Sequence, residues 1–454
     1  MTLPIRTAEP LPKGWASAVL EDYINIAGRI GWRGLKKEEY LSEGIPFLAV
    51  KDILENGSIN FDVTDFLSVF RYEESPEIQL KNNDVLVTKD GTIGKIGFVE
   101  NLPSKVTVNS SILVVRPCQA ILPRFLFYYF KGPKFQKLVR EKIAGTAVPH
   151  LFQHDIKKFE VHIPPFNEQR RIVGKVEELF SFLDAARESL RRVQAQLKRY
   201  RQAVLKYAFE GKHSANWAVC RLESCSNLIT KGESPNWQGF YYVDDGIFFI
   251  RSENVLWGSV RLDNIVKVPQ EFHVKLKRSQ LKADDVLVNL VGASIGRCGI
   301  VPSFVETANI NQAVALIRVN DFLLPEFLMH FLLSPRMQKE IQQNKVETAR
   351  PNISLQNLRD LKIPLPSIDE QKKVVVLINQ TLAKLDNTSD YVKMSLQLSE
   401  RLRQAVLKKA FEGQLVPQDP NDEPAERLLE RIKADRLSNK SKNNNQLELS
   451  QYVK

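Results

Sequence analysis

The chain has 454 residues, which is too many for one compact hydrophobic core and predicts two to four domains. Hydrophobic residues make up 43% and charged residues 26%, as in soluble globular proteins, and no apolar run approaches the roughly 20 residues of a membrane helix. Residues 1–12 lack the basic flank and apolar stretch of a secretory signal, so we expect a cytoplasmic protein. The net charge of +11 is compatible with a polyanionic partner but does not establish one.

The four cysteines, Cys118, Cys220, Cys225 and Cys298, form no C-x-x-C pair and have no histidines at zinc-finger spacing. Thiols in the cytoplasm are usually kept reduced. We therefore expect reduced and mostly buried cysteines.

In chain order, each half of the sequence opens with short β-like runs broken by turn residues. The expected strands are 46–50, 85–88 and 111–115 in the first half, and 248–251, 286–290 and 314–318 in the second. Glycine-rich stretches at 91–97 and 292–299 are typical of tight turns between strands. The stretches 123–143 and 325–341 are expected to be helical, so each globular part is predicted to be α+β.

A long helix is predicted to follow the first globular part. Apolar or aromatic residues recur in alternating steps of four and three, as in a coiled coil. They are Ile172, Val176, Leu179, Leu183, Ala186, Leu190, Val193, Leu197, Tyr200, Val204 and Tyr207. Asn167 is the expected N-cap and Gly211 the expected stop, which gives a spacer of roughly 65 Å at about 1.5 Å per residue.

A second helix of this kind is predicted over 369–413, with capping-box spacing at Ser367 and Glu370. Its seam is interrupted by Thr381, Thr388, Ser395 and Ser399. Pairing of the two helices would bury both apolar stripes.

The two halves are copies of one unit. Residues 201–211 (RQAVLKYAFEG) return as residues 403–413 (RQAVLKKAFEG), at an offset of 202. Residues 84–87 return as 285–288, where the offset has slipped to 201. The copies span 11–212 and 213–414, whereas stretches such as 23–46 and 224–247 agree little. One scaffold therefore carries two different surfaces.

Residues 163–169 (IPPFNEQ), a long helix and then R-Q-A-V-L-x-x-A-F-E-G together resemble the signature of type I restriction-modification specificity subunits. The signature occurs a second time from residues 363–371 (IPLPSIDEQ), and the resemblance covers 11–414. It implies an α+β fold with two tandem target-recognition domains, joined by two long helices that form an antiparallel coiled coil with a pseudo-twofold repeat.

The resemblance also implies five segments. They are a first recognition domain (11–165), a central spacer helix (166–212), a second recognition domain (213–366), a second spacer helix (367–414) and a tail (415–454). Within the tail, a short amphipathic helix is expected over 424–437, and the polar stretch 438–446 is expected to be disordered.

A subunit of this family has no catalytic site. The resemblance implies that each recognition domain reads one half of a bipartite site on double-stranded DNA, and that the helices set the spacing. Two methyltransferase subunits and two restriction subunits with translocase activity are the implied partners, which methylate adenine or cleave. S-adenosylmethionine, ATP and Mg²⁺ are expected on those partners, and no cofactor or metal on this chain.

Motifs for catalysis fit the sequence poorly. A methyltransferase needs Asn or Asp before Pro-Pro-aromatic, but Ile163 stands there. The turn from Gly91 to Lys95 lacks P-loop spacing. His150 and His154 could share a helix face as metal ligands, but their counterparts are Asn352 and Gln356 and no third ligand is evident.

Polar side chains on the predicted turns are the candidates for DNA contact, because turns can reach base edges and phosphates. In the first copy they are Lys51, Asp52, Lys89, Asp90, Thr92, Lys95, Asn109, Thr146 and His150. In the second copy they are Arg251, Glu253, Asn254, Asn289, Ser294, Arg297, Asn311, Gln312, Arg350 and Asn352. Lys95 and Arg297 occupy matching positions in the glycine turns and are expected to be free to face DNA.

Two alternatives remain open. The helix cations Arg191, Arg192, Lys198, Arg199 and Arg201 could contact phosphates or acidic partner surfaces, or form a solvated coiled-coil face. The whole chain could instead be a coiled-coil scaffold with two protein-binding heads and no DNA role.

Overall fold

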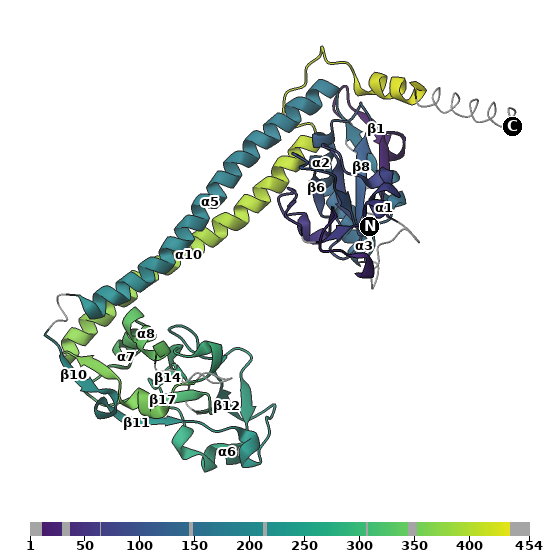
Figure 1. Cartoon of the computed structure of the whole chain (residues 1–454). Coiled ribbons are helices and arrows are strands. Elements are labelled where there is room, and N and C mark those ends of the chain that lie inside the picture. Colours follow the sequence, from purple (N-terminus) through teal and green to yellow (C-terminus); the bar gives the residue numbers. More distant parts are fainter. Residues whose placement is uncertain are drawn as a thin grey trace, which may run out of the picture. The chain divides into compact units, whose positions relative to one another are not determined.

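The computed structural model describes residues 11–29, 37–63, 65–144, 149–211, 216–305, 307–343 and 352–435. The chain divides into two compact units, Met1–Glu188 with Leu396–Lys454, and Ser189–Ser395. Each unit contains one globular head and parts of two long helices, α5 (Phe166–Glu210) and α10 (Ile368–Phe411) (Figure 1). Because this division falls inside both long helices, it differs from the five segments implied by the resemblance, whose boundaries stay a prediction.

The head of the first unit is built around two of its sheets. Their strands are β2 (Ile24–Ala27), β3 (Ile45–Leu48), β4 (Phe66–Leu67), β5 (Val85–Thr88), β6 (Ile96–Phe98), β7 (Thr107–Val108) and β8 (Ile112–Pro117). One sheet is antiparallel in the order β2-β8-β5-β6, and the other has the order β4-β3-β7. Strand β3 runs antiparallel to β4 and parallel to β7.

Strand β5 shows how this head is layered. Val85 and Val87 belong to the core beneath helix α2 (Pro123–Lys131), whereas Leu86 belongs to the core shared with the three-stranded sheet. Successive side chains of a strand point to opposite faces, so a strand that is covered on both sides reads as a continuous apolar run. The four-stranded sheet therefore lies between helices and a second sheet.

The head of the second unit repeats this topology. Its strands are β11 (Ser226–Lys231), β12 (Ile247–Ile250), β13 (Val266–Val268), β14 (Val286–Asn289), β15 (Cys298–Ile300), β16 (Ala308–Ile310) and β17 (Val314–Val319). The sheet orders are β11-β17-β14-β15 and β13-β12-β16, with β12 parallel to β16. The sequence repeat is thus a repeat of the fold.

The first and last strands of each head pair with one another. Strand β1 (Ala16–Val19) runs antiparallel to β9 (Glu160–Ile163), and β10 (Ala218–Arg221) runs antiparallel to β18 (Lys362–Leu365). Strands β9 and β18 lead directly into α5 and α10. Each head is therefore closed at the point where a long helix begins.

The stretches predicted to be helical after the strands of each copy are helical, and each is divided into two helices. They are α2 with α3 (Pro133–Ala144), and α7 (Pro325–Leu332) with α8 (Pro335–Gln343). Gly132 is extended, with φ −75° and ψ 165°. A residue that precedes proline is pushed out of the helical region, which explains the break before Pro133.

The predicted N-terminal cap is confirmed for α10 but not for α5. Ser367 and Glu370 form the expected capping box, since Ser367 N donates to Glu370 Oε2 at 3.1 Å and Glu370 N donates to Ser367 Oγ at 3.4 Å. The expectation of Asn167 as the N-cap of α5 is wrong. The helix begins at Phe166 and includes Asn167.

Within each unit the two long helices pack side by side in opposite directions (Figure 1). In the first unit, Asp184 pairs with Arg403, and Arg187 lies 3.9 Å from Glu400, so residue numbers rise on one helix as they fall on the other. In the second unit, Arg201 pairs with Asp386. These partners are equivalent in the repeat, which confirms the predicted antiparallel coiled coil.

The predicted seam of α5 is wrong near its carboxyl end. Val193, Tyr200 and Tyr207 are 36%, 59% and 64% exposed, and the buried residues there are Leu205, Ala208 and Phe209. These three pack in the core of the second head, together with Val374 and Ile378 of α10. Packing against the head, rather than a strict heptad, therefore sets the buried face at this end.

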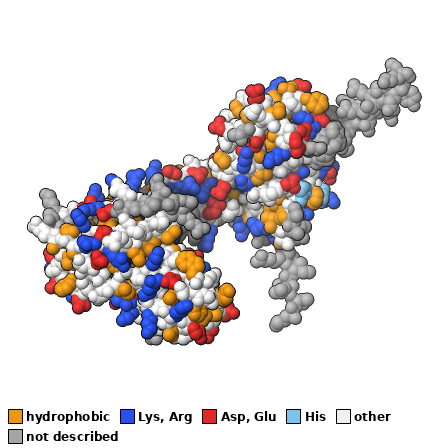
Figure 2. Space-filling view, turned by 60° about the horizontal axis from the view of Figure 1, so that its bottom comes forward, with side chains coloured by type: hydrophobic (Ala, Val, Ile, Leu, Met, Phe, Trp, Pro, Cys, Tyr) orange, Lys and Arg blue, Asp and Glu red, His pale blue; other side chains and the backbone are white. Residues whose placement is uncertain are grey.

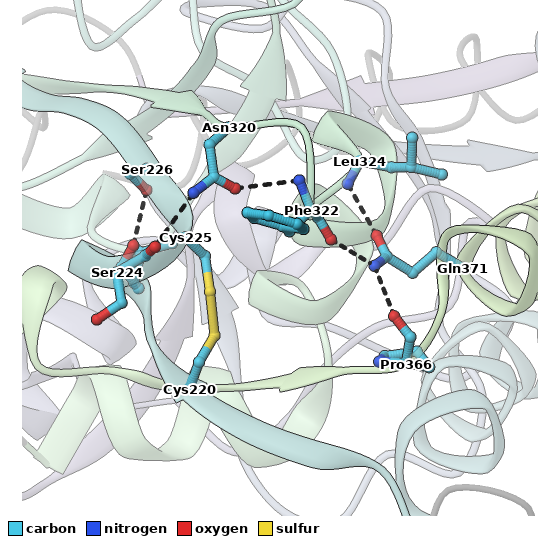
Figure 3. The surroundings of a disulfide bond; sticks show 10 residues. Cys220, Ser224, Cys225, Ser226, Asn320, Phe322, Leu324, Pro366 and Gln371 are labelled. Atoms are coloured by element: carbon cyan, nitrogen blue, oxygen red, sulfur yellow. Dashed lines mark hydrogen bonds between the residues drawn. A yellow bond between two sulfur atoms is a disulfide. The ribbon is translucent and has the colours of Figure 1, made fainter.

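The expectation of reduced cysteines is wrong for one pair. Cys220 in β10 and Cys225 in the turn Leu222–Cys225 form a disulfide, with 7.1 Å between their Cα atoms (Figure 3). The turn folds the chain back, so that cysteines five positions apart meet without a C-x-x-C motif. Cys118 and Cys298 are free, and burial raises the pKa of the Cys298 thiol.

The tail contributes one helix over 425–435, whose Ala425, Leu428, Leu429 and Ile432 pack against the core of the first head. The polar stretch 438–446 lies outside the described residues. Among the residues that are described, no helix combines the length and apolar character that a membrane span requires.

Candidate nucleic-acid interface

In the second head, turns that are distant in the sequence meet beyond the end of β14. Asn289 Nδ2 donates to Ser252 O at 2.7 Å, which ties the glycine turn to the turn after β12. Leu290 N donates to Ala313 O at 2.8 Å, and Ile353 N donates to Leu290 O at 3.0 Å. We call the segments 251–254, 289–297, 311–313 and 352–353 the second turn cluster.

The first head gathers the equivalent segments in the same way. Lys89 N donates to Ser111 O at 2.8 Å, and Leu151 N donates to Lys89 O at 3.0 Å. Lys95 Nζ donates to Ile53 O at 2.8 Å. We call the segments 49–53, 88–95, 109–111 and 149–151 the first turn cluster.

Strand direction explains the convergence. Because β3 and β7 run parallel, the turns after both strands emerge at one edge of the sheet, where Asn109 N donates to Leu48 O at 2.9 Å. Parallel β12 and β16 do the same in the second head, where Asn311 N donates to Ile250 O at 3.0 Å. Residues that the sequence spreads over a hundred positions are thereby placed on one surface.

All the predicted DNA-contact residues that the structure describes lie in these two clusters. Thr146 and Arg350 lie outside the described residues. The clusters bring together residues that the sequence had only suggested as separate turns, and whether each one contacts DNA stays a prediction.

Some of these residues stabilise the turns rather than face solvent. Asp52 Oδ2 accepts from Ala49 N at 2.7 Å, and Asn254 Oδ1 accepts from Arg251 N at 2.9 Å. Asp52 is only 5% exposed and Asn254 only 3%. Burial raises the pKa of the Asp52 carboxyl, against the lowering effect of its backbone hydrogen bond. Little of either side chain is left to reach a ligand.

Asn109 and Asn311 also fix their own turns. Asn109 Oδ1 accepts from Ser111 N at 3.0 Å, and Asn311 Oδ1 accepts from Ala313 N at 3.1 Å. Asparagine commonly bonds to the backbone two residues ahead in this way. Neighbouring Gln312 is half-buried, and Asn352 forms a β-bridge with Val291.

Contrary to the expectation, Lys95 is not free, and its contact with DNA stays a prediction. Its Nζ donates to Ile53 O at 2.8 Å and to Val50 O at 3.4 Å, which ties the glycine turn to the neighbouring turn. Arg297 at the matching position is half-buried, and its Nε has no hydrogen-bond partner among the described residues. Spacing alone could not distinguish these two environments.

The charged residues at the cluster surfaces are mostly paired with acidic neighbours. Lys51 Nζ lies 2.9 Å from Asp65 Oδ2, and Arg251 pairs with Glu253. His150 pairs with Asp90, whereas Lys89 is buried, with its Nζ 3.8 Å from Asp90 Oδ2. The uncharged candidates are Thr92, which is exposed, and Ser294, which is half-buried and donates to Val291 O at 3.4 Å.

On the face shown in Figure 2, Lys and Arg side chains are spread over both heads, interspersed with acidic and apolar side chains. On the long helices, Arg201 pairs with Asp386, and Arg192 donates to Ser189 Oγ at 3.1 Å. Over the described ranges, no group of three or more His, Cys, Asp or Glu side chains could hold a metal ion.

Sequence reasoning missed a matching motif at the edge of both clusters. Residues 40–47 (YLSEGIPF) match residues 242–249 (YVDDGIFF) at the offset of 202, within stretches that had seemed to differ. Leu41 forms an antiparallel bridge with Phe66, and Val243 forms the equivalent bridge with Lys267. The shared Tyr and Gly-Ile at one offset were the signal that could have revealed it.

A family model described as the type I restriction modification DNA specificity domain matches residues 12–195 and 216–397. The chain is 27% identical over 467 residues to the type I restriction enzyme EcoBI specificity subunit of Escherichia coli, covering 94% of each chain. It is 21% identical over 430 residues to the MjaVIII specificity subunit of Methanocaldococcus jannaschii, covering 89% of this chain and 94% of the relative.

Solved structures share the fold. One chain comes from a study of complex assembly and conformational transition of the type I R-M system, with a TM-score of 0.70, 22% identity and coverage of 90% of this chain and 100% of that one. The HsdS subunit from Thermoanaerobacter tengcongensis matches with a TM-score of 0.56, 21% identity and coverage of 89% and 98%.

Proposed function

This chain belongs to the type I restriction-modification DNA specificity family, and from that premise we propose that it reads DNA sequence for a larger complex and catalyses no reaction itself. Each head reads one half of a bipartite site, and the paired helices set the distance between the half-sites. Adenine methylation and restriction take place on partner subunits.

One observation carries this proposal. The two turn clusters share a backbone frame, as shown by the equivalent bonds at Asn109 and Asn311, yet they present different side chains. Lys51 of the first cluster corresponds to Glu253 of the second, and both side chains are exposed. Two heads with one frame and different surfaces suit the reading of two different half-sites.

The proposed partners are double-stranded DNA, two methyltransferase subunits and two restriction subunits with translocase activity. S-adenosylmethionine, ATP and Mg²⁺ belong to those subunits in this proposal, because the methyltransferase and P-loop motifs fit the sequence poorly. A DNA-reading complex of this kind would act in the cytoplasm.

Exchange of one head tests the assignment directly. Residues 215–362 would be replaced by the matching segment of a related subunit, and methylated sites would be mapped in a host that supplies the methyltransferase. We expect one half of the methylated motif to change and the other to persist. A change in both halves would show that the heads are not independent readers.

The alternative is a scaffold whose heads bind proteins. Duplex binding by the complex with its methyltransferase partners, measured against salt concentration, separates the two functions. Phosphate contacts release counterions, so a DNA-reading subunit should bind less tightly as salt rises. Binding that does not depend on salt would favour the scaffold. Methylation or cleavage of DNA by the homogeneous chain alone would contradict the non-catalytic assignment.

A further inference from the structure

Tyr40 and Tyr242 occupy equivalent positions at the edges of the two turn clusters. Tyr40 packs on Phe47 with 4.9 Å between ring centroids, and Tyr242 packs on Phe249 with 5.9 Å between centroids. Phe47 and Phe249 are fully buried in β3 and β12. The buried phenylalanine therefore fixes each tyrosine ring next to the strand that leads into the first turn of the cluster.

Tyr242 also lies next to the basic residue of that turn. The guanidinium of Arg251 lies 5.9 Å from the centroid of the Tyr242 ring. The Tyr242 phenol therefore borders a cation that could draw a phosphate toward it.

Neither side chain is buried, although large aromatic residues usually are. Tyr40 is 38% exposed and Tyr242 is 47% exposed. Within the described part of the chain, no side-chain hydrogen bond involves either hydroxyl. Each phenol is thus held in place by its ring and has a hydroxyl available for a ligand.

The repeat indicates which part of DNA such a group would contact. If the two heads read different half-sites, a residue that is the same in both cannot be the one that distinguishes bases. Contacts to phosphate and sugar carry no sequence information and fix the position of the protein on the duplex, and tyrosine hydroxyls commonly make them.

Resting on the proposed function, we propose that Tyr40 and Tyr242 each donate a hydrogen bond from the phenolic hydroxyl to a DNA phosphate, one in each half-site. The contact positions each turn cluster against the duplex. Sequence is then read by cluster residues that differ between the heads, such as Lys51 and Glu253.

The test compares Tyr40→Phe, Tyr242→Phe and the double variant in the complex with its methyltransferase partners. The probes are a duplex that carries the methylated motif mapped for the wild-type complex and a scrambled duplex of equal length. Phenylalanine keeps the packing on Phe47 and Phe249, so the fold should be retained. Tyr391→Phe is the matched control, because Tyr391 is 70% exposed on α10 and belongs to neither turn cluster.

We expect each single variant to weaken binding of both duplexes by the same factor, about tenfold for a hydrogen bond to a charged group. The salt dependence should keep its wild-type slope, because the lost group carries no charge and releases no counterion. The double variant should lose the product of the two factors, and Tyr391→Phe should bind like the wild type.

Two results would overturn the inference. Wild-type binding by both single variants would show that the hydroxyls do not contact DNA. A loss confined to the motif duplex would show that they read bases rather than phosphates. Failure of the proposed function looks different, because the wild-type complex itself would then bind neither duplex in a salt-dependent manner.

Discussion

The dipeptide Glu-Gln occurs at the start of both long helices, at residues 168–169 and 370–371, and the structure explains the role of its glutamine. Gln371 Oε1 accepts from Leu324 N at 2.8 Å, and its Nε2 donates to Phe322 O at 2.8 Å and to Pro366 O at 3.0 Å (Figure 3). Gln169 makes the equivalent three bonds in the first head, and both side chains are fully buried. One amide thus joins the start of each long helix to the loop before α2 or α7.

Replacement of this amide should be costly. Gln371→Leu leaves a backbone N–H and two carbonyls without their partner in a buried site, and we expect a loss of about 2–4 kcal/mol in the free energy of unfolding. Urea unfolding of the purified chain would measure the change in the free energy of unfolding. Gln380→Leu, an exposed change on the same helix, is the control. Equal stability of the two variants would show that the amide is not a structural link.

Lys95 illustrates a residue whose role changed once its surroundings were known. Its ammonium group is half-buried and bonded to two carbonyls, whereas Lys51 in the same cluster has a side chain that is 59% exposed. We expect Lys95→Met to lower the free energy of unfolding by about 1–2 kcal/mol. Lys51→Met should stay within about 0.5 kcal/mol of the wild type, because exposed ion pairs contribute little.

Thermal unfolding of both variants would measure this difference in stability. Duplex binding by both variants, measured against salt concentration, would show how much each lysine contributes to DNA binding. The exposed Lys51 should account for more of the salt dependence than Lys95. Wild-type stability of Lys95→Met would contradict the structural role of Lys95. If Lys95→Met changed the salt dependence of duplex binding more than Lys51→Met did, Lys95 would be a DNA-contacting residue.

At the scale of elements, one pair of equivalent positions joins a helix of each head to its long helix. In the second unit, His330 of α7 lies 2.8 Å from Asn379 Oδ1 of α10 through its Nε2. In the first unit, Tyr128 of α2 lies 3.5 Å from Glu177 of α5, and Arg124 donates to the same carboxylate at 2.7 Å. The frame is common to both heads, but only the second docks through a histidine.

The buried histidine should make the second head sensitive to acid. Desolvation lowers the pKa of His330, against the raising effect of Asn379, so the folded state binds its proton less readily than the unfolded chain. Stability is then present above the unfolded pKa of about 6.5 and is lost as pH falls below it. We expect hydrogen exchange in α7 to accelerate between about pH 6.5 and pH 5 more than exchange in α2.

A His330→Leu variant provides the control, because it cannot be protonated. It should remove the acid-dependent part of the α7 exchange while leaving α2 unchanged. If α7 in the variant and in the wild type respond alike to pH, other groups cause the acid sensitivity.

Elements with a strong local pattern were predictable, and elements that depend on distant contacts were not. The apolar run at Val85–Thr88 and the Ser367–Glu370 box carry their own signals, and both were found. The helix break at Gly132 was also local, in the proline that follows it, but was overlooked. The displaced seam near Tyr200 depends on packing against the second head. The Cys220–Cys225 bond is local, but the spacing of the cysteines did not indicate the turn that brings them together.

The same distinction applies to the candidate interface. Sequence placed its residues on turns, and parallel pairing of β3 with β7 and of β12 with β16 brought those turns together. Pairing partners of this kind are nonlocal, so the bonds of Lys95 and the burial of Asp52 could not be read from spacing.

At the scale of the whole molecule, the chain order and the structural units differ. Each unit takes part of α5 and part of α10, so the first head is completed by the end of α10: Leu407, Ala410 and Phe411 lie in its core. The second head is completed by Leu205, Ala208 and Phe209 from α5 in the equivalent way. Both long helices are therefore shared between the units, and residues 184–203 and 383–405 are in neither head's core, so an insertion there would not add residues to a core.

The proposed spacer role predicts the outcome of such a change. One heptad would be inserted between Arg187 and Leu190 of α5, together with a matched heptad between Ser389 and Val392 of α10, which are equivalent positions. Seven residues add about 10 Å of helix and keep the apolar faces in phase. At about 3.4 Å per base pair, the nonspecific gap of the methylated motif should widen by up to roughly three base pairs.

Both half-sites should be retained, because the inserted residues lie outside the turn clusters. Methylation mapping in a host that carries the double insertion and the methyltransferase would measure the gap. An insertion in α5 alone is the control, and it should lower activity because the partner helix cannot follow. An active double variant whose gap stays at the wild-type length would show that something other than the helix pair sets the spacing.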